Sequence, residues 1–296
     1  MACAPCRQPG VGAIGDNHDM DRYAVIGHPV GHSKSPLIHA LFAQATGQAL
    51  AYTAIEAPLD GFAATVDAFR AAGGRGLNVT LPFKLEACAY ADEVSERARV
   101  AGAANALAFD GGRCRADNFD GVGLVRDLQV NLGQPLAGRR VLVLGAGGAA
   151  RGALQPLLQA GPDAVVVANR SVAKAEALVA ALQALGLGRE KLAACGYADL
   201  AGQPPFDVVI NATAASLGGE PLPLPSGVFA PVTLAYDMVY GQGLTPFLRQ
   251  ARAAGAGRLA DGLGMLVEQA AESFAWWRGV RPDTRPVIER LATPLT

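Results

Sequence analysis

The sequence predicts an α/β protein divided into two domains, and three observations lead to this fold class. The chain has 296 residues, which is more than one compact core usually holds. Strand-like and helix-like stretches alternate in both halves, as is typical of mostly parallel sheets covered by helices. A glycine-rich segment directly follows one of the expected strands.

The first half of the chain predicts strands separated by helices. The apolar run Tyr23–Ile26, closed by Gly27, predicts a strand. Ser35 is expected to cap the next helix, because Pro36 suits a first helical position. The following elements are expected to be a strand over 49–55, a helix with Phe62, Val66 and Phe69 on one face, and a strand over 77–80.

The second half predicts a doubly wound unit. A buried strand over 140–144 leads into the glycine-rich segment and a helix over 149–159. Further strands are expected over 164–168, 207–211 and 234–238, with a helix over 172–185. After Asp261-Gly262 the pattern is helical over 265–277 and 283–291, and we expect these helices to pack back on the first domain.

These assignments predict a discontinuous first domain. It would comprise residues 21–121 and 262–296, an N-terminal sheet domain completed by C-terminal helices. The doubly wound domain, residues 122–261, would be inserted between these parts. Residues 1–20 are expected to form a flexible extension.

Charge and hydropathy argue against several classes of protein. The formal net charge is −1 without a concentrated basic face, so we expect neither a nucleic-acid nor a membrane partner. No apolar run approaches the roughly 18 residues that cross a bilayer, and the first residues do not resemble a signal peptide. We therefore expect a cytoplasmic monomer or homodimer that acts on a small molecule.

The cysteines and histidines predict no metal site. Cys3 and Cys6 form a single C-x-x-C pair, without the second pair that a zinc site needs, and the other cysteines lie far apart. The four histidines all lie early in the chain and make no H-E-x-x-H pattern. We expect free thiols and no bound metal.

The glycine-rich segment has the G-x-G-x-x-A spacing of a dinucleotide-binding turn between a strand and a helix. Gly145 permits the tight turn, Gly147 lets the backbone approach a pyrophosphate, and Ala150 allows close packing. The free amides of the next helix, near Gly148 and Ala149, favour phosphate binding. The sequence therefore predicts a Rossmann-type domain.

The end of the next strand predicts the type of dinucleotide. NAD sites usually place Asp or Glu about 20 residues after the glycine loop. Here the chain has Asn169, Arg170 and Ser171, with Lys174 one turn later. A carboxylate would repel a 2′-phosphate, whereas a guanidinium binds it with paired hydrogen bonds. We therefore expect the cofactor to be NADP.

Polar clusters in the first half predict a site for a hydroxylated acid. Ser33 and Ser35 lie beside a helix N-terminus, which can hold a carboxylate. Asn78 and Thr80 end a strand on the same face, at the sheet edge where α/β proteins bind ligands.

Two further clusters, 102–105 and 117–121, complete this set, and Lys84 adds an amine. Taken alone, Asn105 is as well explained as a turn residue, and Asp120 as a helix N-cap before 121–128. Together the clusters supply one lysine, carboxylate and amide groups, and several hydroxyls, which fits a hydroxylated ring acid.

In their order along the chain, these segments resemble those of shikimate dehydrogenases. The resemblance runs from about Tyr23 to the C-terminus and rests on Ser33–Pro36, Asn78–Lys84, the Asn105 segment, Asn118–Gly121, the glycine loop, Asn169–Ser171, Asn211–Thr213, Tyr236–Tyr240 and Asp261–Met265. It implies the reversible NADPH-dependent reduction of 3-dehydroshikimate to shikimate, a step of chorismate and aromatic amino acid biosynthesis.

The resemblance also implies roles for individual residues. Lys84 and Asp120 would form the catalytic pair. The substrate carboxylate would bind Ser33, Ser35 and Tyr240, and the ring hydroxyls would contact Asn78, Thr80, Asn105 and Gln269. NADP would bind Gly145, Gly147, Gly148, Ala149, Asn169, Arg170, Ser171, Lys174 and Thr213, with Met238 and Gly262 near the nicotinamide.

Two positions depart from the family pattern. Phe119 and Ala106 stand where the family usually has Thr, and we hypothesise that both changes are tolerated. Three alternatives remain open: an NAD-using quinate/shikimate dehydrogenase, a non-catalytic domain that senses such a ligand, and a dehydrogenase of similar plan acting on a folate. Arg170 argues against the first, Lys84 with Asp120 against the second, and the Ser33/Ser35 pair against the third.

Overall fold

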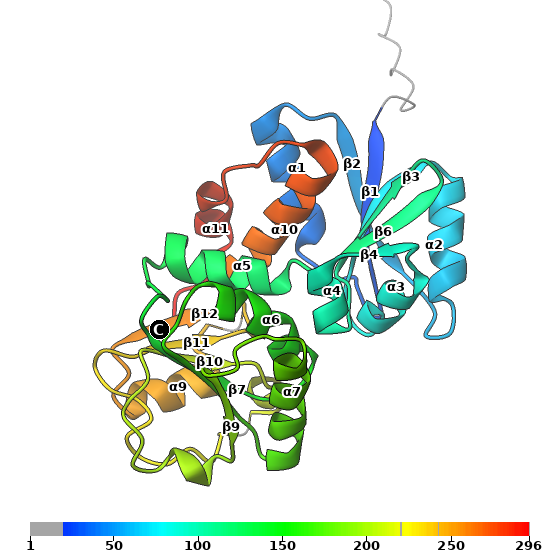
Figure 1. Cartoon of the computed structure of the whole chain (residues 1–296). Coiled ribbons are helices and arrows are strands. Elements are labelled where there is room, and N and C mark those ends of the chain that lie inside the picture. Colours follow the sequence, from blue (N-terminus) through cyan, green and yellow to red (C-terminus); the bar gives the residue numbers. More distant parts are fainter. Residues whose placement is uncertain (1–19, 220, 242, 296) are drawn as a thin grey trace, which may run out of the picture.

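The computed structural model describes residues 20–219, 221–241 and 243–295, which form two lobes, each built on a six-stranded sheet (Figure 1). Cys3, Cys6 and His18 lie outside the described residues. Within the described ranges, no helix is long and apolar enough to span a bilayer.

The first sheet has the strand order β2-β1-β3-β5-β6-β4. Its strands are β1 (Asp21–Gly27), β2 (Leu50–Glu56), β3 (Gly74–Val79), β4 (Glu93–Val94), β5 (Ala106–Asp110) and β6 (Arg113–Asp117). β1 runs parallel to β2 and β3, whereas β5 runs antiparallel to β3 and β6. The sheet is therefore mixed, with the predicted parallel part on one side.

Helices cover both faces of this sheet. They are α1 (Ser35–Thr46), α2 (Phe62–Ala71), α3 (Lys84–Tyr90) and α4 (Glu96–Ala101). The expected apolar face of α2 is confirmed, because Phe62, Val66 and Phe69 are buried in a core with Ile26 and Leu77.

The second sheet is entirely parallel, with the order β12-β11-β10-β7-β8-β9. Its strands are β7 (Arg140–Leu144), β8 (Ala164–Ala168), β9 (Leu192–Cys195), β10 (Val208–Asn211), β11 (Leu234–Asp237) and β12 (Arg258–Asp261). Its helices are α6 (Gly148–Gln159), α7 (Val172–Ala184), α8 (Ala215–Gly218) and α9 (Pro246–Ala253), with a 3₁₀ turn over Ala198–Leu200. This is the doubly wound arrangement that the sequence predicts.

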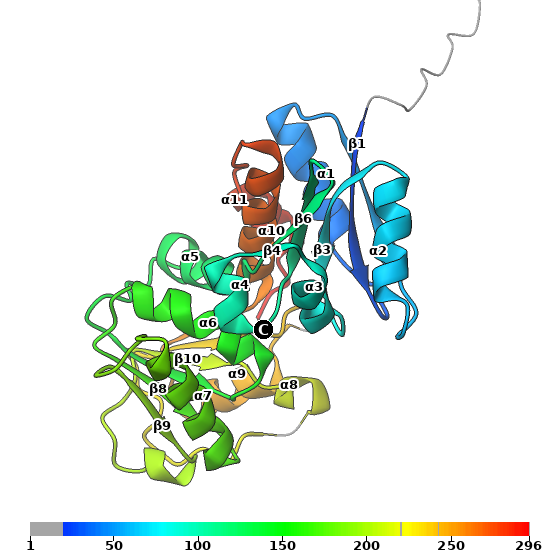
Figure 2. The ribbon, with the colours of Figure 1, turned by 45° about the vertical axis from the view of Figure 1, so that its right-hand side comes forward.

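Two helical segments connect the lobes. α5 (Asp120–Arg126), continued by a π-helix over Asp127–Asn131, leads into the second lobe, and α10 (Leu263–Arg278) leads back, followed by α11 (Arg285–Leu291). Figures 1 and 2 both show α10 beside α1 in the first lobe, where Phe42 and Phe274 share a core. The C-terminal helices thus complete the first lobe, although the boundaries of the two domains stay a prediction.

The starts of two helices correct the predicted caps. Ser35 is the first residue of α1 rather than its cap, and the Ser33 hydroxyl accepts the Ser35 amide at 3.3 Å. Asp120 likewise begins α5, and the Asn118 side chain accepts the Asp120 amide at 3.1 Å. In both helices the residue two positions earlier satisfies the exposed amide, so the side chain at the first helical position is available for other contacts.

Candidate functional site

A polar recess of about 200 Å³ lies where the first lobe meets the end of β11, at the carboxyl end of β3 and against α10. Strand β3 supplies one wall, the start of α1 a second, and the start of α10 a third. Its lining residues are Val25, Ser33, Ser35, Asn78, Val79, Thr80, Lys84, Asn105, Asp120, Met238, Tyr240, Gly262, Met265, Leu266 and Gln269. All of the predicted catalytic and substrate-binding residues therefore lie around one cavity.

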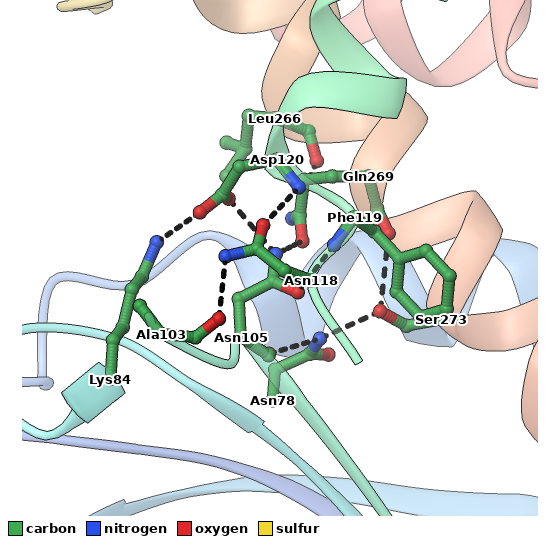
Figure 3. A network of polar contacts seen from close by, with 10 residues as sticks. All are labelled: Asn78, Lys84, Ala103, Asn105, Asn118, Phe119, Asp120, Leu266, Gln269 and Ser273. Carbon is green, nitrogen blue, oxygen red and sulfur yellow. Dashed lines mark hydrogen bonds and ion pairs between the residues drawn. The ribbon is translucent and has the colours of Figure 1, made fainter. Parts of the chain in front are cut away.

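The predicted catalytic pair is formed directly. Lys84, at the start of α3, places Nζ 2.6 Å from Asp120 Oδ2, at the start of α5 (Figure 3). The other carboxylate oxygen, Oδ1, accepts a hydrogen bond from Asn105 Nδ2 at 2.9 Å. Both oxygens of Asp120 thus have donors, so the carboxylate is fixed and its direct partner is the amine.

Asn105 links Asp120 to the opposite wall. Its Nδ2 also donates to Gln269 Oε1 at 3.1 Å, and its Oδ1 accepts the Phe119 amide at 2.8 Å. Gln269 in turn donates to the Leu266 carbonyl at 2.8 Å. The side chain of Asn105 is therefore a structural part of the site, not the turn residue that it could be when read alone.

Asn78 is held by four groups of the protein. Its Nδ2 donates to the Asn105 carbonyl at 3.2 Å and to Ser273 Oγ at 2.8 Å. Its Oδ1 accepts from Tyr52 Oη at 2.8 Å and lies 3.1 Å from His39 Nε2. His39 and Tyr52 contact Asn78 without lining the recess themselves, and no sequence motif indicates a role for them.

The recess also has hydroxyl groups on its wall. Ser33, Ser35 and Tyr240 line it, and the Lys34 amine lies 5.8 Å from the Tyr240 ring centroid. Burial raises the pKa of Tyr240, with Asp261 adding to the rise, so its phenol remains a proton donor at neutral pH. Three hydroxyl donors near a cation suit a carboxylate ligand.

A larger cleft of about 760 Å³ lies between the lobes and adjoins the recess. The glycine loop, at residues 146–149, and helix α7 supply one side, and the start of α3 supplies the other. Four residues line both cavities: Lys84, Asp120, Met238 and Met265. The lysine–aspartate pair therefore stands where the two cavities meet.

The glycine loop has the backbone shape that its spacing predicts. Gly145 has φ +108°, a conformation that side chains with a Cβ rarely adopt. A Cβ on Gly147 or Gly148 would meet nothing within 4 Å, so the backbone there is open to a ligand. Ala150 is fully buried, as close packing of helix on strand requires.

The predicted 2′-phosphate residues are only partly at the cleft. Lys174 lines it, whereas Asn169, Arg170, Ser171 and Thr213 are not among its lining residues. Asn169 Nδ2 donates to the Ser171 carbonyl at 2.9 Å, and Thr213 Oγ1 donates to Asn211 Oδ1 at 2.7 Å.

The cleft also contains a cation that is not among the predicted site residues. Arg151, in the first turn of α6, lines the cleft beside the glycine loop. Like Lys174, it forms no ion pair with another described residue, so both cations face the cleft without a protein carboxylate. The signal for it was a basic residue directly after the glycine-rich segment.

Met238 and Gly262 meet at the floor of the recess. A Cβ on Gly262 would lie 2.2 Å from the Met238 carbonyl oxygen, so only glycine fits at this start of α10. The close approach brings the end of β11 against α10, where both lobes contribute to the cavity wall.

Neither departure from the family pattern lies on the wall of the recess. The Phe119 ring is buried against Trp276, at 5.7 Å between ring centroids, with the Arg97 guanidinium 5.1 Å from its centroid. Ala106 is fully buried in β5. No described group of three or more His, Cys, Asp or Glu side chains is arranged to hold a metal ion.

Comparison with known protein families gives matches along most of the chain. A model described as the shikimate dehydrogenase substrate binding domain matches residues 25–107. A model for shikimate/quinate 5-dehydrogenase matches residues 127–218, and one for the shikimate 5′-dehydrogenase C-terminal domain matches residues 262–292.

Curated relatives are similar over nearly their whole length. The shikimate dehydrogenase (NADP(+)) of Methylobacillus flagellatus is 61% identical over 272 residues, which covers 92% of this chain and 99% of the relative. The enzyme of the same name from Nitrosospira multiformis is 58% identical, covering 93% of this chain and 98% of the relative.

Solved structures share the fold. An Ael1 enzyme from Pseudomonas putida has 60% identity and a TM-score of 0.89, over 93% of this chain and 100% of its own. Shikimate 5-dehydrogenase from Thermus thermophilus, solved with NADP(H) and shikimate, has 36% identity and a TM-score of 0.79, over 91% of this chain and 98% of its own.

Proposed function

Because this chain belongs to the shikimate dehydrogenase family, we propose that it catalyses the reversible NADPH-dependent reduction of 3-dehydroshikimate to shikimate. It is an NADP-linked oxidoreductase, and its reaction is a step of chorismate and aromatic amino acid biosynthesis. Its assembly as a monomer or homodimer and its cytoplasmic location stay predictions.

The residues of the cleft fit NADP. The first amides of α6 and the open backbone at Gly147 and Gly148 suit a pyrophosphate. Lys174, with Arg170 and Ser171 on the preceding loop, would hold the 2′-phosphate, and Asn169 and Thr213 would shape the loops around it. When bound, NADPH supplies the hydride for the reduction.

Lys84 would supply the proton. Reduction of a ketone puts negative charge on its oxygen, and an ammonium beside that oxygen stabilises the charge and donates a proton. Asp120 holds the amine at 2.6 Å and is itself held by Asn105, so the ammonium has a defined direction. In the reverse reaction the neutral amine accepts the proton from the shikimate hydroxyl.

The remaining side chains of the recess would bind and orient the ring acid. Ser33, Ser35 and Tyr240 would donate to its carboxylate, and Asn78, Thr80, Asn105 and Gln269 would contact its hydroxyls. Since Asn78 and Asn105 already donate both amide hydrogens to protein groups, a ring hydroxyl would share or replace one of these bonds.

The observation that carries the proposal is the position of the Lys84–Asp120 pair, which lines both the recess and the cleft. A proton donor for this reaction must reach the carbonyl while that carbonyl faces the nicotinamide. The junction of the two cavities meets this requirement.

The test is the initial rate of NADP reduction by shikimate, for the wild type and Lys84→Ala. We expect fast turnover in the wild type and a loss of about a thousandfold in kcat for the variant. Parallel assays with NAD and with quinate test the alternative that the chain is an NAD-using quinate/shikimate dehydrogenase. Turnover only with one of these, or shikimate binding without any turnover, would refute the proposed reaction.

A further inference from the structure

Two aromatic side chains stand behind the recess and have no part in the mechanism above. Tyr52 comes from β2 and His39 from α1, and their rings are parallel, 4.1 Å apart and tilted by 5°. His39 is 1% exposed. Both direct a polar atom at the same acceptor, Asn78 Oδ1.

The surrounding groups leave the Asn78 amide one orientation. The Asn105 carbonyl can only accept a hydrogen bond, so the atom of Asn78 that faces it must be the nitrogen. Asn78 Oδ1 therefore faces Tyr52 and His39, and it needs donors from both. Tyr52 therefore donates its hydroxyl proton to Asn78 Oδ1.

The same reasoning fixes the tautomer of His39. Its Nε2 must carry the proton that Asn78 Oδ1 accepts, so Nδ1 is the unprotonated nitrogen. Nδ1 is buried and has no hydrogen-bond partner among the described residues, so no acceptor is present to stabilise a second proton on the ring. Burial lowers the pKa of His39 to about 3, against a smaller opposing effect of Asn78, so the ring stays neutral.

The Tyr52 phenol keeps its proton. Burial raises its pKa well above the ordinary value, so the hydroxyl stays neutral and donates to Asn78 Oδ1 at 2.8 Å.

We propose that Tyr52 and His39 are positioning residues for the substrate: they fix the Asn78 amide before the ring acid binds. The proposal rests on the proposed function, because it takes shikimate as the ligand of the recess. Neither residue lines the recess, so both act through Asn78.

A positioning role predicts that loss of either side chain raises KM for shikimate and leaves kcat and KM for NADP almost unchanged. Among the described residues, neither Tyr52 nor His39 forms a hydrogen bond with Lys84 or Asp120, and neither lines the cleft. Loss of their donors should weaken shikimate binding while leaving proton transfer and NADP binding nearly intact. A residue that only stabilised the fold would lower the midpoint of unfolding and leave KM unchanged.

The chain offers a matched control for Tyr52. Tyr23, on β1, is the direct register partner of Tyr52 in the same sheet and likewise lies against Trp277. Its hydroxyl lies 3.4 Å from Arg278 rather than near the recess. Tyr52→Phe and Tyr23→Phe thus each remove one hydroxyl from neighbouring strands, and only the first touches the site.

The experiment compares KM for shikimate, KM for NADP and kcat among wild type, Tyr52→Phe and Tyr23→Phe. We expect Tyr52→Phe to raise KM for shikimate about tenfold, the effect of one hydrogen bond, with kcat and KM for NADP within about threefold. Tyr23→Phe should match the wild type. His39→Leu should raise KM for shikimate, and His39→Gln, which keeps an N–H donor, should restore it.

Two results would overturn the proposal: an unchanged KM for shikimate in Tyr52→Phe, or an equal rise in Tyr23→Phe. Calorimetric titration of shikimate into the same proteins gives a readout that needs no turnover. If the wild type binds shikimate without oxidising it, the proposed function fails, while the loss of binding in Tyr52→Phe still decides the positioning role.

Discussion

The recess and the cleft meet at the Lys84–Asp120 pair, but their polar groups are held in different ways. In the recess, Asn78 and Asn105 have each amide atom bonded to another protein group. In the cleft, Arg151 and Lys174 line the wall without an ion pair to any described residue.

This difference indicates how each cavity selects its ligand. A ligand that does not match the recess must move Asn78 or Asn105, and each hydrogen bond to the protein that is broken in this way costs about 0.5–1.5 kcal/mol. The cleft relies on backbone shape and on long cationic side chains that can adjust to phosphates. Selectivity for the ring acid should therefore be steep, and selectivity among dinucleotides more gradual.

The strongest way to break the recess is to change the carboxylate that the lysine and Asn105 share. Asp120→Asn keeps the size of the side chain but places an amide beside the Lys84 amine. We expect kcat to fall about a hundredfold, because the ammonium loses its orienting charge. Initial rates with saturating shikimate and NADP measure this, and an unchanged kcat would remove Asp120 from the proposed pair.

Acid should lower the stability of the fold through His39, the buried histidine behind the recess. His39 is neutral when folded, with a pKa of about 3 against an ordinary 6.5, so the unfolded chain binds its proton first as the pH falls. The stability that this provides is present above pH 6.5 and is lost as the pH falls toward 3. Between pH 7 and 5 the loss is about 2 kcal/mol.

Urea unfolding of the wild type and His39→Gln at pH 7 and pH 5 measures the contribution of His39 to the free energy of unfolding. The variant lacks the titrating ring, so its free energy of unfolding should decline less between pH 7 and 5. Equal declines in both proteins would mean that His39 is already protonated in the fold.

The cleft should respond more mildly to a single change. Lys174→Ala removes one of two unpaired cations, and we expect KM for NADP to rise about tenfold while KM for NAD stays unchanged. KM for shikimate is the internal control, because Lys174 does not line the recess. An equal rise with NAD and NADP would place this lysine at the pyrophosphate instead of the 2′-phosphate.

The smallest kinetic effect is expected at Phe119. Since its ring lies against Trp276 and Arg97, Phe119→Thr should change kcat/KM for shikimate by less than about threefold. The free energy of unfolding should fall by about 2–4 kcal/mol, because a buried aromatic ring is lost. A hundredfold gain in kcat/KM, alone or with Ala106→Thr, would mean that these departures tune the substrate.

Much of the fold follows from local sequence signals. Long apolar runs such as 140–144 and the glycine loop define the second sheet, and these predictions are confirmed. The hairpin β5–β6 was missed, although Gly111 and Gly112 form its turn with positive φ angles. Strands β9 (LAAC) and β12 (RLAD) were missed because they contain no β-branched or aromatic residue, whereas the equally short β10 (VVIN) and β11 (LAYD) do.

The members of the site could be predicted, but their partners could not. Lys84, Asn105 and Asp120 belong to compact motifs, whereas Asn78 meets Ser273 across 195 positions of sequence. His39 sits in a helix whose apolar face gives no hint that one ring nitrogen reaches a strand. Only tertiary packing brings such groups together, so no local sequence pattern predicts the contacts between them.

The wall that the two cavities share also has a thermodynamic consequence. Lys84, Asp120, Met238 and Met265 border both the recess and the cleft. Whichever ligand arrives first fills the space on one side of these residues and restricts them for the other. By linkage, if bound NADP raises the affinity of the protein for shikimate by some factor, bound shikimate raises its affinity for NADP by the same factor.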